Sequence, residues 1–306
     1  MIYTCTLNPA IDMFIKLENL DYNSVNRSDF CELTPNGKGV NVSIILKLLD
    51  LDCKNLGFIG GEIGDFIENG ILDKGIGTDF VEIKSNNRIN IFINLDDKKE
   101  LKIVNPGPFI EKKYQEELIE KIKKINKNDW LILSGSSPRN IEDDFILEIA
   151  RICHDRQINL CMDISSNIIL KCAKYKPFLI KPNEEELLSW FNDKEGDFNK
   201  YKKYSEKLME LGVQNVLLTL GSEGGILFNS NQTIVADAPK VEVVNTAGAG
   251  DTVLGTFVGS IIQGESTLKA FLKSIAAGSE TANKSWLISD FDKIDNMIEG
   301  IKYKIS

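Results

Sequence analysis

The segment VEVVNTAGAGDTVLGTF, residues 241–257, joins a strand pattern, a glycine-containing turn and the start of a helix. Its alternating valines predict a strand, and the apolar spacing of residues 252–263 predicts a helix. The turn between them is Gly248-Ala249-Gly250-Asp251. Glycine lets a backbone approach a ligand closely, and the first amides of a helix lack partners inside it and attract negative charge. The segment therefore predicts an anion site at the start of this helix.

Asp251 is the acidic residue of this turn. Its carboxylate could lie beside a bound phosphoryl group and accept a proton from an attacking hydroxyl. An aspartate that only caps its helix fits the spacing equally well. A dinucleotide site is a weaker interpretation, because GxGxxG requires Gly or Ala where the chain has Val253. No Walker A sequence occurs, so a nucleoside triphosphate needs another mode of binding.

Along most of the chain, short apolar runs alternate with longer helical patterns, which is typical of βα units around a largely parallel sheet. The runs predict strands at residues 2–7, 55–59, 130–133, 159–163, 178–180 and 216–220. The spacing predicts helices at residues 40–49, 66–74, 112–125, 141–156, 184–191 and 201–211, and a mostly helical region at 249–304.

Two segments interrupt this rhythm, residues 12–33 and 88–104, which have the pattern of extended chain without a helix between strands. They predict a small separate sheet. In an α/β protein such an outgrowth is well placed over the carboxyl ends of the strands, where ligands bind, so we expect a lid or a dimer-forming flap. Ordinary edge hairpins are the alternative.

Charge and composition limit the class of partner. The 306 residues are 42% hydrophobic and 26% charged, enough for one large α/β domain or two smaller ones. The net charge of −9 does not attract a polyanion, so we expect no nucleic-acid partner. No apolar run approaches the ~18 residues of a membrane span, and the chain opens without a cleavage signal. We therefore expect a cytoplasmic protein with no membrane partner.

The histidine and cysteine content limits the chemistry. The single histidine, His154, lies in a predicted helix, where a partly exposed structural position is expected. Histidine triads and multi-histidine metal sites within one chain are excluded. Six cysteines occur without a CxxC pair, and we interpret all six as reduced structural thiols: Cys5, Cys31, Cys53, Cys153, Cys161 and Cys172.

The motifs resemble those of the ribokinase (PfkB-type) family of sugar kinases. Asn245-Thr246-Ala247-Gly248-Ala249-Gly250-Asp251-Thr252 is similar to the C-terminal signature of that family. Asn36-Gly37-Lys38-Gly39-Val40-Asn41 resembles its N-terminal Gly-Gly-Lys-Gly-x-Asn motif, with Asn36 in the place of a glycine. The likeness covers essentially all 306 residues.

Further motifs resemble the sugar-phosphate branch of the family, which contains 1-phosphofructokinase and tagatose-6-phosphate kinase. They are Thr6-Leu7-Asn8-Pro9-Ala10-Ile11-Asp12, Arg88-Ile89-Asn90, Ser134-Gly135-Ser136 and Lys181-Pro182-Asn183 with Glu186. The Arg-Ile-Asn step favours the 1-phosphofructokinases. The resemblance implies a ribokinase-like, three-layer α/β/α fold with a mainly parallel central sheet. It also implies one kinase domain over residues 1–306, with a small β-sheet lid formed by about 12–33 and 88–104.

The resemblance also implies site residues. Asp251 would be the catalytic base, and Gly248, Ala249 and Gly250 would form the anion hole. The sugar phosphate would bind to Asp12, Gly37, Lys38, Gly39, Asn41, Arg88, Asn90 and Ser136. The nucleotide would bind to Lys181, Asn183, Thr219, Gly221, Ser222, Gly224 and Asn283, and Glu186 would hold Mg²⁺ through water.

Several of these residues also have a purely structural interpretation. Lys38 and Arg88, taken singly, are typical of solvated surface positions. Asn183 and Glu186 have the spacing of a helix capping box, which does not exclude a metal. Asp12 fits a charge on the surface of the lid, and Asn283 fits a polar helix face.

The implied activity is transfer of the γ-phosphoryl of ATP, with Mg²⁺, to the 6-hydroxyl of fructose 1-phosphate, by a homodimer paired through the lid strands. The same chemistry on tagatose 6-phosphate or fructose 6-phosphate is the alternative. Alternatives from other classes are a non-catalytic sugar-phosphate sensor and a nicotinamide-dependent oxidoreductase that uses residues 248–250.

Overall fold

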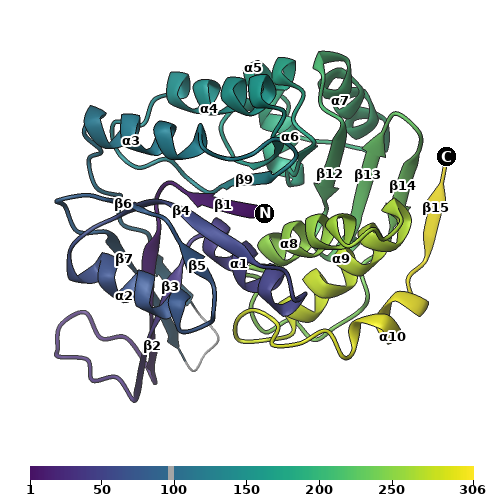
Figure 1. Cartoon of the computed structure of the whole chain (residues 1–306). Coiled ribbons are helices and arrows are strands. Elements are labelled where there is room, and N and C mark those ends of the chain that lie inside the picture. The colour runs from purple at the N-terminus through teal and green to yellow at the C-terminus, as the bar shows by residue number, and fades with distance from the viewer. Residues whose placement is uncertain (96–99) are drawn as a thin grey trace.

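The computed structural model describes residues 1–95 and 100–306, and in it one large twisted sheet lies between two layers of helices (Figure 1). The described strands of this sheet number eleven. Their order is β15 (Tyr303–Ile305), β14 (Thr233–Ala236), β13 (Gly225–Asn229), β12 (Asn215–Thr219), β11 (Leu179–Ile180), β10 (Asn159–Asp163), β9 (Trp130–Ser134), β1 (Ile2–Thr6), β4 (Cys53–Ile59) and β5 (Gly77–Thr78). β6 (Val81–Glu82) pairs with β4 beside β5.

The strands from β5 to β12 run parallel, and β13 to β15 continue the sheet antiparallel. This agrees with the predicted, mainly parallel sheet. The antiparallel strands β13 to β15 do not follow from the apolar runs identified above, and β15 overlaps the end of the region, 249–304, that we expected to be mostly helical. The strand expected at residues 241–244 is wrong, because these residues form no strand and lie in a partly exposed loop.

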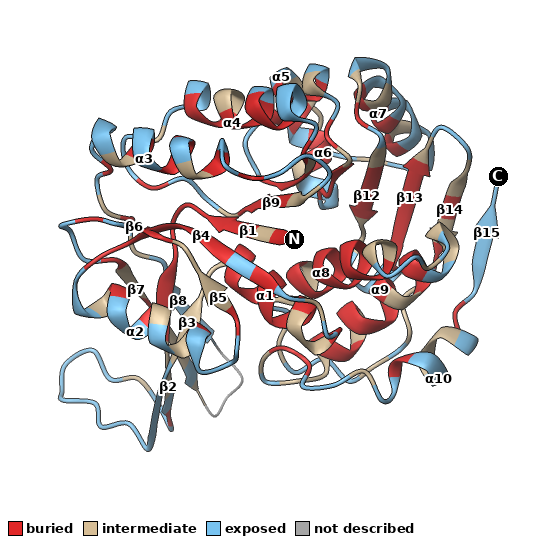
Figure 2. Cartoon of the chain, viewed as in Figure 1, coloured by how far each residue is buried: buried red, intermediate tan, exposed pale blue. Residues whose placement is uncertain are grey.

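Helices cover both faces of the sheet, and the alternation of side chains along each strand explains why. Leu131 and Leu133 point to one apolar cluster, while Ile132 between them points to the other. The first cluster is completed by α3 (Lys112–Ile122), α4 (Asp143–Arg156), α5 (Ile168–Cys172), α6 (Glu184–Trp190) and α7 (Phe198–Leu211). The second is completed by α1 (Lys38–Leu48), α2 (Gly61–Leu72), α8 (Ala249–Ile262), α9 (Thr267–Ala282) and α10 (Ile294–Glu299). Figure 2 shows the buried residues concentrated in the sheet and on the inner faces of the helices.

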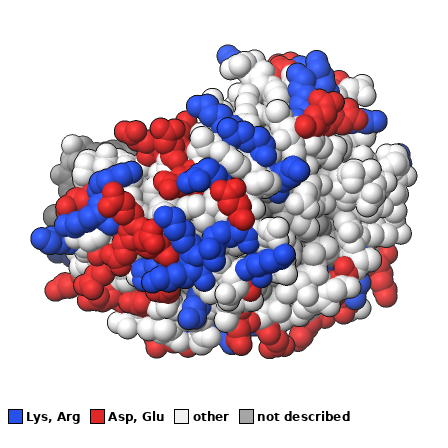
Figure 3. All heavy atoms as spheres, turned by 45° about the horizontal axis from the view of Figure 1, so that its top comes forward, with Lys and Arg blue, Asp and Glu red and all other residues white. Residues whose placement is uncertain are grey.

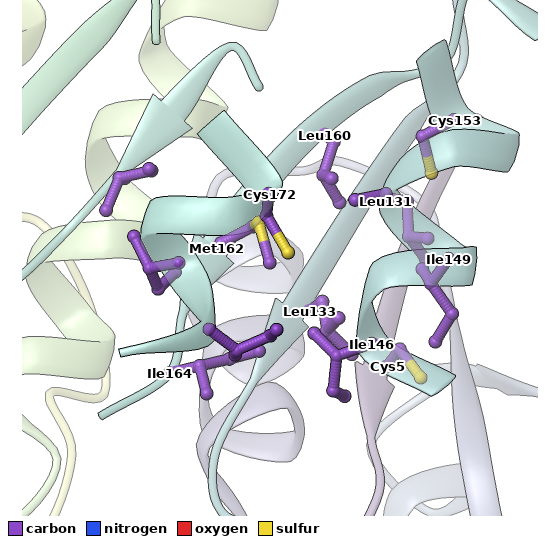
Figure 4. Packing of buried hydrophobic residues seen from close by; sticks show 14 of the residues in the cluster. Cys5, Leu131, Leu133, Ile146, Ile149, Cys153, Leu160, Met162, Ile164 and Cys172 are labelled. Carbon is purple, nitrogen blue, oxygen red and sulfur yellow. The ribbon is translucent and has the colours of Figure 1, made fainter. Parts of the chain in front are cut away.

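Five of the six cysteines are buried. Figure 4 shows Cys5, Cys153 and Cys172 among leucine and isoleucine side chains of the first cluster. Burial raises the pKa of the Cys153 thiol to about 12, so it stays protonated and packs as a small apolar group. Cys31, in contrast, is exposed on β3 of the small sheet described next.

A second, four-stranded sheet stands beside the large one (Figure 1). Its order is β3 (Phe30–Asn36), β2 (Ala10–Leu17), β7 (Arg88–Leu95) and β8 (Glu100–Ile103). It confirms the small sheet expected from segments 12–33 and 88–104, although residues 96–99 of the second segment lie outside the described residues. α2 packs against β2 and β3, where Pro35 lies close to Gly70.

Two further properties of the structure concern membrane-spanning helices and surface charge. Among the described residues, no helix is both long and apolar enough to cross a bilayer. On the face shown in Figure 3, lysine and arginine side chains lie intermixed with aspartate and glutamate.

Candidate active site

A cavity of about 880 Å³ lies at the carboxyl ends of the parallel strands. Asp163 is the last residue of β10, Thr219 is the last residue of β12, and Lys181 follows β11 directly. Because parallel strands end at the same edge of a sheet, these side chains meet although they are far apart in sequence. The start of α8 also lines the cavity.

Most of the site residues named from the sequence lie together in the lining of this cavity. They are Lys38, Asn41, Lys181, Asn183, Glu186, Thr219, Gly221, Ser222, Gly224, Gly248, Ala249, Gly250 and Asp251. The lining also contains residues that the sequence did not assign to the site, among them Asn36, Asp163, and the loop of Ala238, Pro239 and Lys240.

The remaining residues lie outside the described lining. Asp12 and Asn90 are buried in the small sheet, where Asn90 donates to Asp12 and Asp12 accepts from Asn36 of the cavity lining. Gly37 and Gly39 pack α1 closely against Thr6. Asn283 ends α9 and faces Glu280, while Ile275, Gly278, Ser279 and Ala282 of that helix line the cavity.

The glycine-containing turn has the geometry of an anion site. Gly248 adopts a φ of 78°, a left-handed conformation that favours glycine, and α8 begins at the next residue. Within the described chain, the amides of Gly250 and Asp251 have no protein acceptor. A Cβ atom on residue 250 would lie 3.3 Å from Lys181 Nζ, so that ammonium group faces the turn directly. Two amides without a protein acceptor and the ammonium group of Lys181 therefore all lie at the start of α8.

Asp251 lies in the first turn of α8, next to Gly250, and is 6% exposed. Asn41 Nδ2 donates a hydrogen bond of 2.8 Å to its Oδ2 atom. Burial, and then the negative charge of Asp163, raise the pKa of Asp251 to about 6, although Asn41 and the nearby lysines act in the opposite direction. A carboxylate with this pKa is mostly ionised at neutral pH and accepts a proton more readily than an ordinary aspartate.

Asp163 holds two lysines at the floor of the cavity. Its carboxylate, 1% exposed, lies 3.1 Å from Lys38 Nζ and 3.3 Å from Lys181 Nζ. Burial lowers the pKa of Lys38, but Asp163 and the other nearby acids together raise it, so the amine stays protonated. The sequence contained one unused signal for Asp163, since it is a charged residue at the carboxyl end of a strand predicted to be buried.

Asn183 and Glu186 form the capping box of α6. Glu186 N donates to Asn183 Oδ1 at 2.8 Å, and Asn183 N donates to Glu186 Oε2 at 2.9 Å. Ser165 Oγ donates to the other oxygen, Oε1, at 2.7 Å. The carboxylate is thereby fixed at the wall of the cavity and keeps lone pairs for further donors. Within the described residues, no cluster of three or more His, Cys, Asp or Glu side chains could hold a metal.

Arg88 lies between the small sheet and the core. Its guanidinium donates to Asn105 O at 3.0 Å and to Asn8 O at 3.2 Å, and burial lowers its pKa. Asn8 Nδ2 in turn donates to Ser136 Oγ at 3.3 Å, and Ser136 is exposed. Arg88 therefore joins β7 to the loop after β8 and to the loop after β1. Lys38 packs beside Gly135, near Ser136.

The fold, the glycine-containing turn at a helix start and the buried carboxylate of Asp251 together are typical of a phosphotransferase that acts on a hydroxyl group. Residues 6–293 match the pfkB family carbohydrate kinases, and the chain belongs to this family. This membership excludes the dinucleotide interpretation of the turn.

Similar proteins span nearly the whole chain. The D-tagatose-1-phosphate kinase of Bacillus licheniformis is 43% identical over 303 residues, which cover 99% of each chain. The 1-phosphofructokinase of Bacillus subtilis is 33% identical over 282 residues, which cover 92% of each chain. The solved structure of phosphofructokinase-2 from Escherichia coli is similar in fold, with a TM-score of 0.92 over 98% of each chain and 22% identity. The predicted ribokinase-like kinase fold is confirmed, and the relatives are sugar-phosphate kinases.

Proposed function

We propose that the protein transfers the γ-phosphoryl group of ATP to the 6-hydroxyl of fructose 1-phosphate and yields fructose 1,6-bisphosphate. The observation that carries this proposal is the meeting of the buried Asp251 carboxylate with two unpaired amides and Lys181 in one cavity. The choice of a sugar phosphorylated at carbon 1 is supported by the relatives whose names are 1-phosphofructokinase and D-tagatose-1-phosphate kinase.

The proposed mechanism is direct in-line attack. Asp251 takes the proton of the 6-hydroxyl as the oxygen approaches the phosphorus atom. The amides of Gly250 and Asp251 and the ammonium of Lys181 stabilise the charge on the transferred group, which is the main source of catalysis in such reactions. Lys38 lies on the sugar side, where its charge attracts the phosphate already present on the substrate.

ATP fits the remaining part of the cavity. Thr219, Gly221, Ser222 and Gly224 line the cavity, and α9 contributes small and apolar residues. The donors present suit Mg²⁺, because a fixed carboxylate beside the phosphate site holds this ion through water. In our proposal Glu186 does so, and the ion when bound neutralises phosphate charge.

The acceptor sugar is tested by comparing kcat/KM for fructose 1-phosphate, tagatose 1-phosphate, tagatose 6-phosphate and fructose 6-phosphate, with ADP release as the readout. We expect kcat/KM for the two 1-phosphates to exceed kcat/KM for the two 6-phosphates by about tenfold or more. The reason is that a site shaped for one phosphate position rejects a substrate with the phosphate at the other position. Tagatose 1-phosphate is the second candidate because of the 43% identical relative. A preference for a 6-phosphate contradicts both candidates, and absence of turnover with all four leaves the sensor hypothesis.

We further propose that the small sheet acts as the lid of this site and pairs two copies of the chain. One of its faces is apolar on all four strands, with Met13 beside Leu33 and Ile91, and Ile91 beside Ile103. Leu33 and Ile103 are each 41% exposed. The other face carries Asp12 and Asn90, and Asp12 contacts Asn36 of the cavity lining. A flat apolar face of this kind is self-complementary about a twofold axis.

Charge on the apolar face should separate the proposed dimer. We expect Leu33→Lys to sediment as a monomer in analytical ultracentrifugation and wild type to sediment as a dimer, because a buried unpaired lysine opposes association. The matched control is Lys102→Glu, on the opposite face of β8, which should stay dimeric. A monomeric wild type, or a dimeric Leu33→Lys, contradicts this arrangement.

A further inference from the structure

Asn36 occupies the position where the family pattern has glycine, and the structure shows what its side chain does. It is the last residue of β3 and lines the cavity. The turn does not need an unusual conformation at Asn36, because the positive φ of 148° belongs to Gly37. The side-chain oxygen of Asn36 accepts from Gly37 N in this turn and also from Asn41, so the side chain makes contacts beyond the turn.

The carboxamide of Asn36 belongs to a chain of hydrogen bonds that ends on the catalytic carboxylate. Asn36 Nδ2 donates to Asp12 Oδ2, and Asn90 Nδ2 donates to the other oxygen of Asp12 at 2.8 Å. Asn41 Nδ2 donates to Asn36 Oδ1 at 3.1 Å and to Asp251 Oδ2 at 2.8 Å. Two amides thus link two buried carboxylates, one in the small sheet and one at the start of α8.

The direction of this chain is determined by its ends. An ionised carboxylate only accepts hydrogen bonds, so an amide that contacts it must present its N–H groups. Asp12 therefore orients the nitrogen of Asn36, which leaves the oxygen of Asn36 facing Asn41. That oxygen takes one N–H of Asn41 while the other N–H reaches Asp251, and the buried Oδ1 of Asn41 has no partner in the described chain.

We propose that Asn36 is a positioning residue, which orients Asn41 so that its amide donates to Asp251. Without Asn36, one N–H of Asn41 loses its acceptor. The Asn41 carboxamide is then less firmly held in the orientation that directs N–H rather than C=O toward the base. Asn36 acts through Asn41 and needs no contact with the sugar.

The test measures the pKa of Asp251 in ligand-free protein by ¹³C NMR of aspartate-labelled samples, with the signal assigned by its loss in Asp251→Asn. A lost hydrogen bond to the charged form raises the pKa of a carboxyl group. We therefore expect Asn36→Ala and Asn41→Ala each to raise the pKa of Asp251, whose other charged neighbours Asp163, Lys38 and Lys181 stay in place. In a protein that already carries Asn41→Ala, the further substitution Asn36→Ala should not raise the pKa of Asp251 any more.

The control is Thr34→Val on the same face of β3, whose buried hydroxyl has no partner in the described chain. It should leave the pKa of Asp251 unchanged. Asn36→Gly, which supplies the residue of the family pattern, replaces Asn36→Ala if the alanine variant does not fold. An unchanged pKa in the Asn36 variant, or additive effects in the double variant, overturns the proposal.

A kinetic readout rests on the proposed function. With the sugar phosphate that wild type uses best, Asn36→Ala should lower kcat about tenfold or more and leave KM for ATP unchanged, because a slightly misplaced base is costly. The acid limb of the pH profile should move to higher pH. If wild type uses none of the sugar phosphates, the proposed function fails, and the NMR result still decides the role of Asn36.

Discussion

Asp251→Asn is expected to lower kcat by about 10²- to 10⁴-fold, because an amide cannot accept the proton of the acceptor hydroxyl. In wild type, kcat/KM should fall as the pH drops through about 6, where Asp251 becomes protonated. The residual activity of the variant should lack this limb. Both quantities follow from steady-state kinetics with ATP and the preferred sugar phosphate between pH 5 and 8.

The same substitution should stabilise the fold at neutral pH. The folded-state pKa of Asp251, about 6, lies above the ordinary aspartate value of 3.8, so its ionisation opposes folding increasingly as the pH rises from 3.8 to about 6, and fully above that. Removal of the charge should therefore raise the free energy of unfolding at pH 7.5 by up to about 3 kcal/mol.

A matched control is Asp155→Asn on the exposed side of α4, which should change neither property. If the Asp251→Asn variant keeps near-normal kcat, Asp251 is not the catalytic base. One that unfolds would mean that Asp251 is mainly a structural cap of α8.

The sequence predicted the parallel core well because each buried strand is short, apolar and bounded by polar residues, as at residues 159–163. It did not predict β14 and β15, which are partly and fully exposed and carry a weaker apolar signal. It also did not predict β13, although that strand is buried. The valines of residues 241–244 misled because their alternation reflects a loop that lines the cavity with Val241 and Val243, not a strand in a sheet.

The site was predictable where a motif is contiguous, as in the turn at residues 248–251. Asp163 was missed because its significance depends on Lys38 and Lys181, which come from two other segments and meet it only in the folded chain. Asn36 was noticed as a departure from the family pattern, but its link to Asp12 and Asn41 depends on strand register, which local sequence does not encode.

Lys181→Met should be the second most damaging substitution, with kcat lower by about 10²- to 10³-fold. Lys181 is 5% exposed, and its ammonium lies between Asp163 and Gly250. It can therefore stabilise the transferred phosphoryl group without any rearrangement. Its removal also leaves the buried Asp163 carboxylate with Lys38 alone, so the free energy of unfolding should fall by up to about 3–5 kcal/mol.

Loss of stability and loss of catalysis can be separated by removing the carboxylate as well. The double variant Asp163→Asn/Lys181→Met has no unpaired buried acid, and Lys38, whose side chain is 37% exposed, can turn to solvent. We expect chemical denaturation to show most of the stability restored, while kcat remains low because the cation beside the turn is still absent. If the double variant regains both stability and kcat, Lys181 serves only to neutralise Asp163, and the phosphoryl group is stabilised by the amides of the turn without it.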